Sequence, residues 1–220
     1  MSEPLRVLSL MESAFVTGPA KNLIEFARRA ASPPSGPPVH LEIATYLRAG
    51  EPPNAFVKAA ESAGLRVHIL REARRWDAQP VRDIGKLVEH LQPVLVQSHN
   101  TKSHLFVKLA GVAEKLPWLA FNHGYTATNR MDRLYNHVDR FTLPKAHRVI
   151  AVCQPFADRL MSRGVAPERI RIQHNSVVPF PRPPEEEVHA ARESLRLGGR
   201  NVVLPVGRLS FAKGHADLLH

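Results

Sequence analysis

The stretch PVLVQSHNTKSHLFVKLAGVAEK, residues 93–115, contains the pattern that decides the fold class of this chain. Its apolar run Pro93–Gln97 predicts a buried strand, and a group of polar residues follows at once. From Ser103 to Lys115 the apolar residues recur at helical spacing, in one stripe made of Leu105, Leu109, Val112 and Leu116, with Lys102, Lys108, Glu114 and Lys115 mostly away from it. A strand followed directly by an amphipathic helix is the repeating unit of a parallel α/β sheet.

The same alternation runs along most of the chain. Strand candidates rich in branched residues are Arg6–Met11, Val39–Tyr46, Leu65–Leu70, Pro93–Gln97, Trp118–Asn122, His147–Val152 and Ile170–His174. Nearly every one precedes a stretch with helical periodicity. The pattern therefore predicts an α/β fold in which helices flank a parallel sheet.

A Pro-rich stretch at residues 179–184 divides the chain. It follows the last strand candidate and precedes a new amphipathic stretch, Glu185–Leu197, as an interdomain linker does. The pattern then restarts with a predicted buried strand, Asn201–Val206, a polar loop and a helix start at His215–His220, and such elements cannot bury their own apolar faces. We expect a first domain at 1–178, a linker and connecting helix at 179–199, and the start of a truncated second domain at 200–220.

Composition and charge narrow the function classes. Thirty Lys and Arg against twenty Asp and Glu give a formal net charge of +10, which favours anionic partners such as phosphates, nucleic acid or acidic lipid headgroups. The lone cysteine, Cys153, lies in an apolar run, so no internal disulfide can form and a buried structural thiol is favoured over a nucleophile. No basic leader and no apolar run of about eighteen residues occurs, so the expected location is the cytoplasm.

Ligands of parallel sheets bind beyond the carboxyl ends of the strands, and polar loops follow three of the candidates there. After the first, Gly18 and Pro19 open a helix whose free N–H groups favour a phosphate, although a single glycine is a weak fingerprint and a plain strand-to-helix turn is the favoured explanation. After the fourth, residues 97–102 predict a pocket rim, in which Asn100 or Thr101 also suits a helix cap.

The third loop, residues 121–125, places His123 before Gly124, where a histidine can donate to a ligand or carry charge beside it. His99, His104 and His123 do not make a convincing metal set, because no HExxH or CxxC spacing occurs and no carboxylate flanks them. An ordinary surface or core histidine remains the alternative for each of the three.

The strongest local signal is VGRLSFAKG, residues 206–214. Arg208 and Lys213 lie five residues apart on a loop that leads into a helix start, which suits a doubly charged diphosphate. The chain has neither a Walker A loop nor a GxGxxG pattern, so kinase and dinucleotide-binding readings lack their usual support.

These nine residues resemble the strand-loop-helix motif GRLxxxKG of the GT-B glycosyltransferases of family 4. The resemblance extends over essentially the whole chain through TGPAKNLIEFA, QSHNTKSHLFVKLAG, FNHGYT, the segment from Asp132 to Tyr135 and HRVIAVC, in matching order and spacing. It implies a Rossmann-like N-terminal domain of GT-B architecture, followed by the beginning of a second Rossmann-like domain.

The resemblance also implies a function. A full-length member would be a retaining hexosyltransferase that moves a sugar from a nucleotide-sugar co-substrate to a saccharide or lipid-linked acceptor in cell-envelope glycan or polysaccharide synthesis, with neither cofactor nor metal. Arg208 and Lys213 match the donor-phosphate cations, Gly18 the phosphate-side loop, and His123 the active-site histidine near the transferred sugar. The leaving phosphate accepts the acceptor's proton in this mechanism, so no protein base is assigned. We expect an acceptor-side pocket made of His99, Asn100, Thr101, Lys102 and Tyr125.

Some features depart from the family pattern. The family's Gly-Gly loop is Gly18-Pro19 here, and proline lacks an N–H. An Asn-Gly pair is replaced by Asn175-Ser176, and the paired glutamates of the donor site would lie beyond His220, so we expect the donor site to be incomplete.

Two alternative functions stay open at the sequence level. One is a non-catalytic basic module that docks on anionic membrane, at the inner membrane face, or on an acceptor. The other is a sugar-nucleotide epimerase of the same architecture. Nucleic-acid binding ranks last, because the basic residues are dispersed and no nucleic-acid motif occurs.

Overall fold

A computed structural model describes residues 3–124, 137–177, 179–207, 209 and 214–219. The chain divides into two compact units, Met1–Val177 and Val178–His220, which we call the first and second units. The strands of the first unit are β1 (Leu5–Leu10), β2 (Val39–Arg48), β3 (Val67–Glu72), β4 (Leu95–Ser98), β5 (Trp118–Asn122), β6 (Arg148–Ala151) and β7 (Ile170–Ile172). Its helices are α1 (Gly18–Ala30), α2 (Ala55–Ser62), α3 (Gln79–Leu91), α4 (Thr101–Leu109) and α6 (Gln154–Met161), with short 3-10 turns at Val112–Glu114, Leu143–Lys145 and Pro167–Arg169 and a helical segment at residues 137–142.

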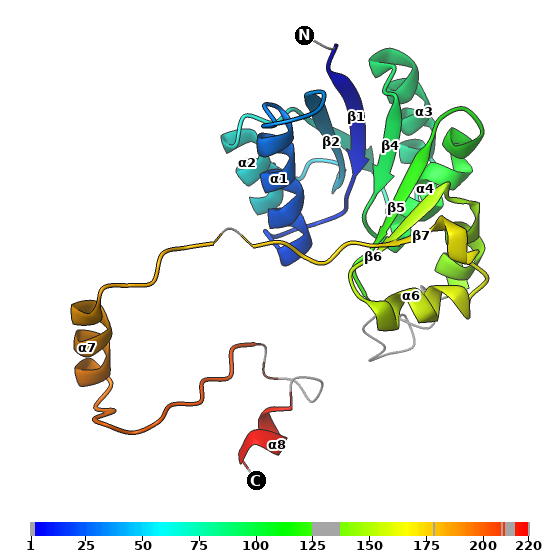
Figure 1. Ribbon diagram of the computed structural model, residues 1–220. Helices are drawn as coiled ribbons and strands as arrows, with labels where there is room; N and C mark the ends of the chain where they lie inside the picture. The colour runs from blue at the N-terminus through cyan, green and yellow to red at the C-terminus, as the bar shows by residue number, and fades with distance from the viewer. Residues whose placement is uncertain (1–2, 125–136, 178, 208, 210–213, 220) are drawn as a thin grey trace. The chain divides into compact units, whose positions relative to one another are not determined.

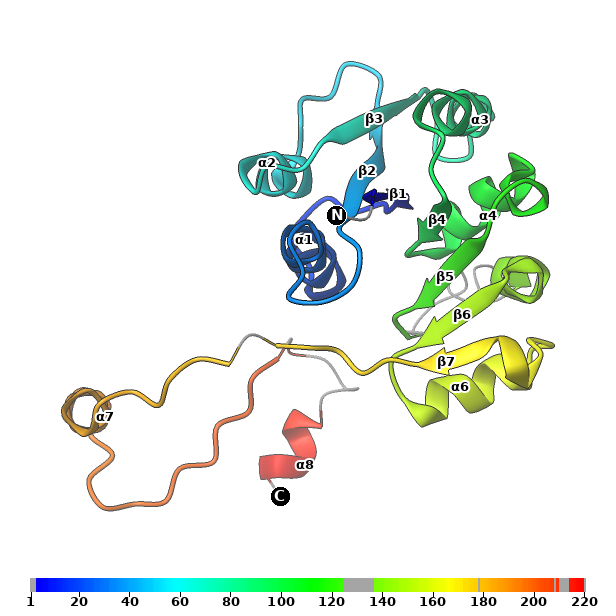
Figure 2. The same ribbon diagram turned by 45° about the horizontal axis from the view of Figure 1, so that its top comes forward.

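The seven strands form one parallel sheet in the order β3-β2-β1-β4-β5-β6-β7 (Figure 1). Successive side chains of a strand point to opposite faces, and both faces are buried in the middle of the sheet. In β1, Leu8 and Leu10 pack with residues of α3 and α4, whereas Val7 packs with α1 and α2. Helices therefore cover both faces, as Figure 2 shows, and the predicted α/β sheet is confirmed.

The sheet has a switch point between β1 and β4. From β1 the chain builds outward through β2 and β3, and then returns to place β4 on the other side of β1. The loops that follow these two strands therefore lead to helices on opposite faces of the sheet. The carboxyl ends of the strands at such a switch point are the usual ligand position in open α/β sheets.

The helix predicted from Ser103 to Lys115 is shorter in the structure. It ends at Leu109, because Gly111 adopts a left-handed conformation with φ of 65° and opens a 3-10 turn. Its buried face is Lys102, Ser103, His104, Phe106 and Val107, and Leu109 from the predicted stripe is 57% exposed. The apolar pattern therefore indicated a helix correctly but misplaced its inner face.

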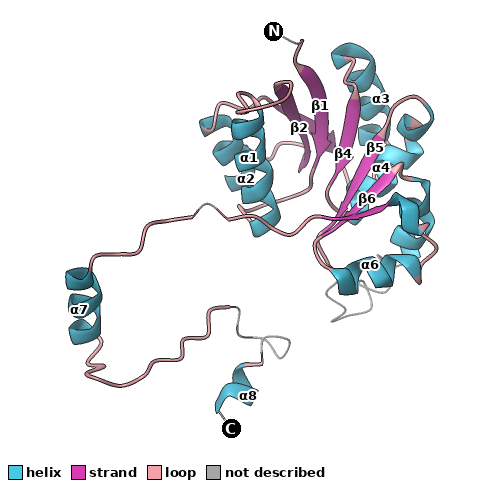
Figure 3. Cartoon of the chain, in the orientation of Figure 1, coloured by secondary structure: helices cyan, strands magenta, loops and turns pink. Residues whose placement is uncertain are grey.

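The second unit contains α7 (Glu185–Ser194) and α8 (His215–Leu219), and Figure 3 draws the chain from Leu195 to Gly207 as loop. The strand predicted at Asn201–Val206 is not formed, and Val203, Leu204 and Val206 are mostly exposed. A strand needs a neighbour for its backbone hydrogen bonds and for its apolar side chains, and the described part of the chain supplies none to these residues.

Candidate functional site

The loop after β1 leads into α1 through a side-chain cap. Thr17 is the N-cap, and its hydroxyl oxygen accepts a hydrogen bond from the Ala20 N–H at 3.4 Å. Gly18 and Pro19 form the first helical residues, so the N–H of Gly18 has no helical partner. A Cβ atom added at Gly18 would meet no atom within 4 Å, and the fold itself therefore does not require glycine there.

Asn100 caps α4 and joins the two sides of the switch point. Its Oδ1 accepts from the Ser103 N–H at 3.0 Å, and its Nδ2 donates to the Glu12 carbonyl oxygen at 2.9 Å. The first contact is the expected helix cap. The second holds the loop after β1 against the start of α4, so Asn100 positions the site through its backbone partners.

Lys102 is buried rather than exposed at a pocket rim. Its side chain is only 2% exposed, and its Nζ donates to Glu72 Oε2 at 2.6 Å and to Glu12 Oε1 at 3.0 Å. The ammonium also lies 4.5 Å from the centroid of the Tyr46 ring. Two carboxylates and an aromatic face compensate for the lost hydration of a buried cation, which explains how a lysine occupies the inner face of α4.

A cavity of about 350 Å³ opens beyond the carboxyl ends of β1, β2 and β3. It is lined by groups of both charge signs and one aromatic ring, namely Glu12, Glu51, Glu72, Arg48, Arg75 and Tyr46, together with Ser13, Ala14, Leu47 and Asn54. The predicted pocket residues His99, Asn100, Thr101 and Lys102 are not among its lining residues. The sequence reasoning missed Arg48 and Glu72, although both are charged residues at the end of a buried strand and a search of every strand end would have found them.

His99 and His123 meet at the ends of β4 and β5. Their Nδ1 and Nε2 atoms are 3.2 Å apart, and their rings are nearly parallel, at 13°. His99 also stacks on Phe121, with ring centroids 4.5 Å apart. Burial lowers the pKa of His99 well below its ordinary value, with the neighbouring histidines acting in the same direction, and burial lowers the pKa of His123 to about 4. Both rings are therefore neutral at pH 7.

A buried polar network supports these strand ends from within. The Trp118 Nε1–H donates to Ser98 Oγ at 2.7 Å, and Ser98 Oγ lies 2.7 Å from His104 Nδ1. His104 also bonds to the backbone of Phe121, and burial lowers its pKa to about 3. If the His104 Nε2–H donates to the Phe121 carbonyl, Nδ1 is left to accept from the Ser98 hydroxyl. The network thus ties α4 to β4 and β5.

The turn after β5 requires glycine. Gly124 has a φ of 105°, and a Cβ atom there would lie 2.5 Å from Phe156 Cε2. Its N–H donates to Asn122 Oδ1 at 3.3 Å. The turn therefore fixes the direction in which the chain leaves His123, as the sequence position of the glycine suggested.

The remaining predicted residues are distributed as follows. Tyr125, Arg208 and Lys213 lie outside the described residues. Cys153 is partly buried, directly before α6. No group of three or more histidine, cysteine or acidic side chains is placed to hold a metal within the part of the chain that the structure describes. Across the same described residues, no helix is long and apolar enough to cross a membrane.

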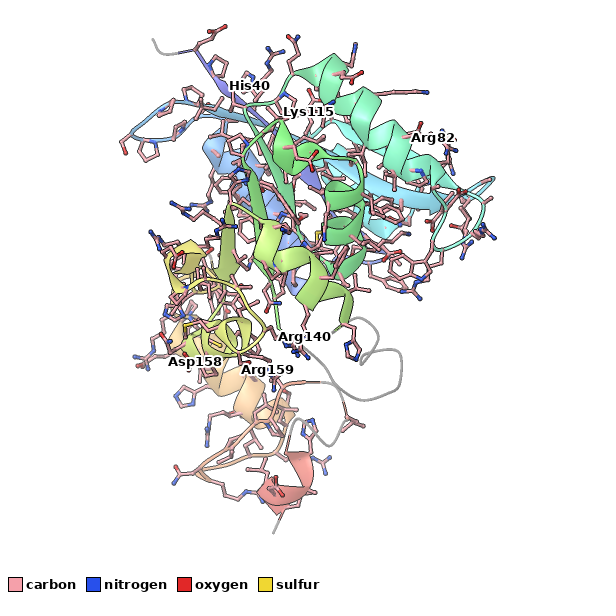
Figure 4. All side chains as sticks on the ribbon, turned by 90° about the vertical axis from the view of Figure 1, so that its right-hand side faces the viewer. His40, Arg82, Lys115, Arg140, Asp158 and Arg159 are labelled. Atoms are coloured by element: carbon pink, nitrogen blue, oxygen red, sulfur yellow. The ribbon has the colours of Figure 1, made fainter. Side chains whose placement is uncertain are left out.

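The positive charge is spread over the first unit. Figure 4 shows Arg82 on α3, Lys115 after the 3-10 turn that follows α4, and Arg159 on α6. All three side chains belong to exposed residues on separate elements. These three cations therefore do not lie along one helix or strand, as the basic residues of a nucleic-acid-binding element often do.

Together, the doubly wound sheet and the polar groups at the carboxyl ends of its strands define a Rossmann-like α/β domain. The sequence model of Glycosyltransferase Family 4 matches residues 26–179, well over half of the chain. The chain belongs to glycosyltransferase family 4. No curated protein matches it in a sequence comparison.

Solved structures support the same fold. HepE from Anabaena, crystallised with UDP, is 16% identical with a TM-score of 0.77, covering 98% of this chain and 56% of HepE. The apo lipopolysaccharide outer core galactosyltransferase WaaB is 14% identical with a TM-score of 0.60, covering 78% of this chain and 46% of WaaB. A UDP-GlcNAc 2-epimerase from Neisseria meningitidis bound to UDP-GlcNAc is 13% identical with a TM-score of 0.54, covering 88% and 51%. The chain therefore has the fold of a GT-B N-terminal domain and spans about half the length of these structures.

Proposed function

We propose that this chain is the acceptor-side part of a glycosyltransferase that moves a sugar from a nucleotide-sugar donor to a saccharide or lipid-linked acceptor. The observation that carries the proposal is the family match over residues 26–179, which coincides with a sheet whose carboxyl edge gathers polar and charged side chains. Structures of HepE with UDP-glucose and of WaaB, a galactosyltransferase, share this fold and support the same class of substrate.

Gly18, Arg208 and Lys213 are the proposed binding residues for the donor diphosphate. At Gly18 the free N–H at the start of α1 and the missing side chain together let an anion approach the backbone. Arg208 and Lys213 add two positive charges on one loop. When the nucleoside diphosphate departs, negative charge grows on its oxygens, and fixed cations and N–H groups stabilise that charge more than the ground state. The proposed reaction is a retaining transfer in which the leaving phosphate accepts the acceptor's proton.

The acceptor is proposed to bind in the cavity beyond β1, β2 and β3. Its volume of about 350 Å³ lies within the usual range for small-molecule sites. Carboxylates and guanidinium groups line it together, and a saccharide hydroxyl can donate to the former and accept from the latter. Glu12 is 34% exposed there while one of its oxygens is held by Lys102. We therefore assign acceptor contacts to Glu12 and Arg48, and a supporting role to Lys102.

Charge removal at the donor loop tests the proposal. In the complete protein, Arg208→Ala and Lys213→Ala should each abolish transfer, measured as nucleoside diphosphate release from UDP-glucose and other nucleotide sugars in the presence of candidate acceptors. Arg182→Ala is a matched control, because it removes the same charge from an exposed position in the Pro-rich linker. Near-normal turnover of both loop variants would overturn the assignment.

The same assay distinguishes a transferase from the alternative function, a sugar-nucleotide epimerase. That alternative stays open because the Neisseria epimerase shares this fold. An epimerase interconverts two nucleotide sugars without an acceptor, whereas a transferase passes the sugar to the acceptor and releases the nucleoside diphosphate.

A role in cell-envelope glycan synthesis is also part of the proposal, with peripheral contact at the inner membrane face. The net charge of +10 supports the contact with an anionic membrane. Sedimentation with anionic vesicles at low and high salt tests it, and binding that is absent at low salt would count against membrane contact.

A further inference from the structure

The contact between His99 and His123 restricts where each ring carries its proton. A neutral imidazole has one N–H and one bare nitrogen. Because His99 Nδ1 and His123 Nε2 lie 3.2 Å apart, a hydrogen bond between them needs a proton on one of these atoms and not on the other. The two outer nitrogens, His99 Nε2 and His123 Nδ1, are then also complementary, so one of them is an N–H donor and the other is bare.

The surroundings of the outer nitrogens distinguish the two arrangements. Both atoms are buried and neither has a hydrogen-bond partner among the described residues. An N–H that is deeply buried without a partner is costly. His99 is 6% exposed and stacked on Phe121, whereas His123 is only partly buried, directly after the carboxyl end of β5. The unpaired N–H is therefore better placed on His123, where a ligand can satisfy it.

We propose that His99 is a positioning residue, whose Nδ1–H donates to His123 Nε2 and thereby holds His123 as the Nδ1–H tautomer with its outer N–H available to a ligand. His99 does not touch substrate in this scheme. The stack on Phe121 fixes the ring of His99, and the bond between Phe121 and His104 fixes the strand end on which that ring rests.

The consequence for binding rests on the proposed function. If the ligand is a nucleotide sugar, His123 Nδ1–H donates to one of its oxygens, and a donor is the form that stabilises negative charge as the diphosphate departs. With the opposite tautomer, His123 would present a bare nitrogen and could only accept a hydrogen bond. His99 would thus determine whether His123 binds the hydrogen-bond acceptors of a sugar–phosphate ligand or its hydroxyl donors.

Imidazole nitrogen NMR of this chain, labelled with ¹⁵N at histidine, tests the tautomer directly. Long-range ¹H–¹⁵N spectra at pH 7 distinguish proton-bearing from bare ring nitrogens, and single substitutions assign the signals of the twelve histidines. The expected pattern is a proton on Nδ1 and none on Nε2 in His123, with a proton on Nδ1 in His99. The reverse pattern in the wild-type chain would overturn the proposal without any substitution.

Two variants then test the role of His99. His99→Asn keeps an N–H near the position of Nδ1 and should preserve the His123 tautomer, whereas His99→Leu removes the donor and should leave His123 averaging between both forms. An unchanged His123 pattern in His99→Leu would refute a positioning role. His68→Leu is the control, because it removes a partly buried histidine that bonds Glu42 in another part of the sheet. If His99→Leu fails to fold, the wild-type pattern and the Asn variant still decide.

Donor binding gives a separate readout in the complete protein. His99→Leu should weaken UDP-glucose binding roughly tenfold, as expected for loss of one oriented hydrogen bond, and His99→Asn should restore most of it. No binding by the wild-type protein to any nucleotide sugar would count against the proposed function and leave the tautomer result standing. The opposite tautomer together with normal binding would refute only the role of His99.

Discussion

Acidification should destabilise the first unit because His104 is held neutral inside it. Burial lowers the pKa of His104 in the folded chain to about 3, from an ordinary value of 6.5. Between these two pH values the unfolded chain binds a proton that the folded chain does not bind, so stability falls as the pH falls. The loss of unfolding free energy through His104 is small above pH 6.5, grows as the pH falls through the interval and stops growing below about pH 3.

The size of the effect follows from the width of the interval. One pH unit corresponds to about 1.4 kcal/mol once the unfolded imidazole is mostly protonated, and to about half of that at pH 6.5, so acidification from pH 6.5 to 4.5 should cost about 2 kcal/mol through His104 alone. His99 and His123 act in the same direction, because burial lowers the pKa of both. This interval lies at or above the ordinary values of the acidic side chains, whose titration belongs mainly to lower pH.

Urea unfolding followed by tryptophan fluorescence measures the effect, since Trp76 and Trp118 both lie in the first unit. His104→Gln is the comparison variant: its amide can still donate to Phe121, but it cannot titrate. From pH 7 to 4.5 the wild-type chain should lose about 2.5 kcal/mol more than the variant. Equal losses in the two proteins would refute the reasoning that His104 is buried and neutral.

Two further predictions concern stability. Gly124→Ala should cost about 1–3 kcal/mol in urea unfolding, because the new methyl group meets Phe156 at a φ of 105°. Gly18→Ala, whose Cβ meets nothing within 4 Å, is its control, and equal stability of the two variants would contradict the turn geometry. Lys102→Met should cost about 3–5 kcal/mol, because Glu12 and Glu72 lose the buried cation between them. Lys115→Met, which removes an exposed pair with Glu89, should change stability by less than about 0.5 kcal/mol, and a similarly small effect at Lys102 would show that the network is dispensable.

The sequence predicted the sheet because its signal is local. Each strand of the first unit is predicted by a short run rich in apolar residues. The central strands are buried on both faces once helices pack on the sheet, whereas the edge strands β3 and β7 keep exposed side chains. The rule that ligands lie beyond strand ends also directed attention to the loops at Gly18, Asn100 and His123. Residue periodicity was enough for these inferences, since it reports how one element meets its surroundings.

Only the tertiary structure decided what the individual side chains do. The charge of Lys102 predicted an outward position, but Glu12 and Glu72, from two other strand ends, make an inward position stable. His99 and His123 are 24 residues apart, and they meet because β4 and β5 are neighbours in the sheet. Residues 201–206 have the pattern of a buried strand, yet the described chain offers them no strand partner. The sequence by itself determined the strands and helices of the first unit and predicted the carboxyl edge of the sheet as the place for ligands. The pairing of distant segments determined burial, protonation and contact, because those properties depend on neighbours that no local pattern specifies.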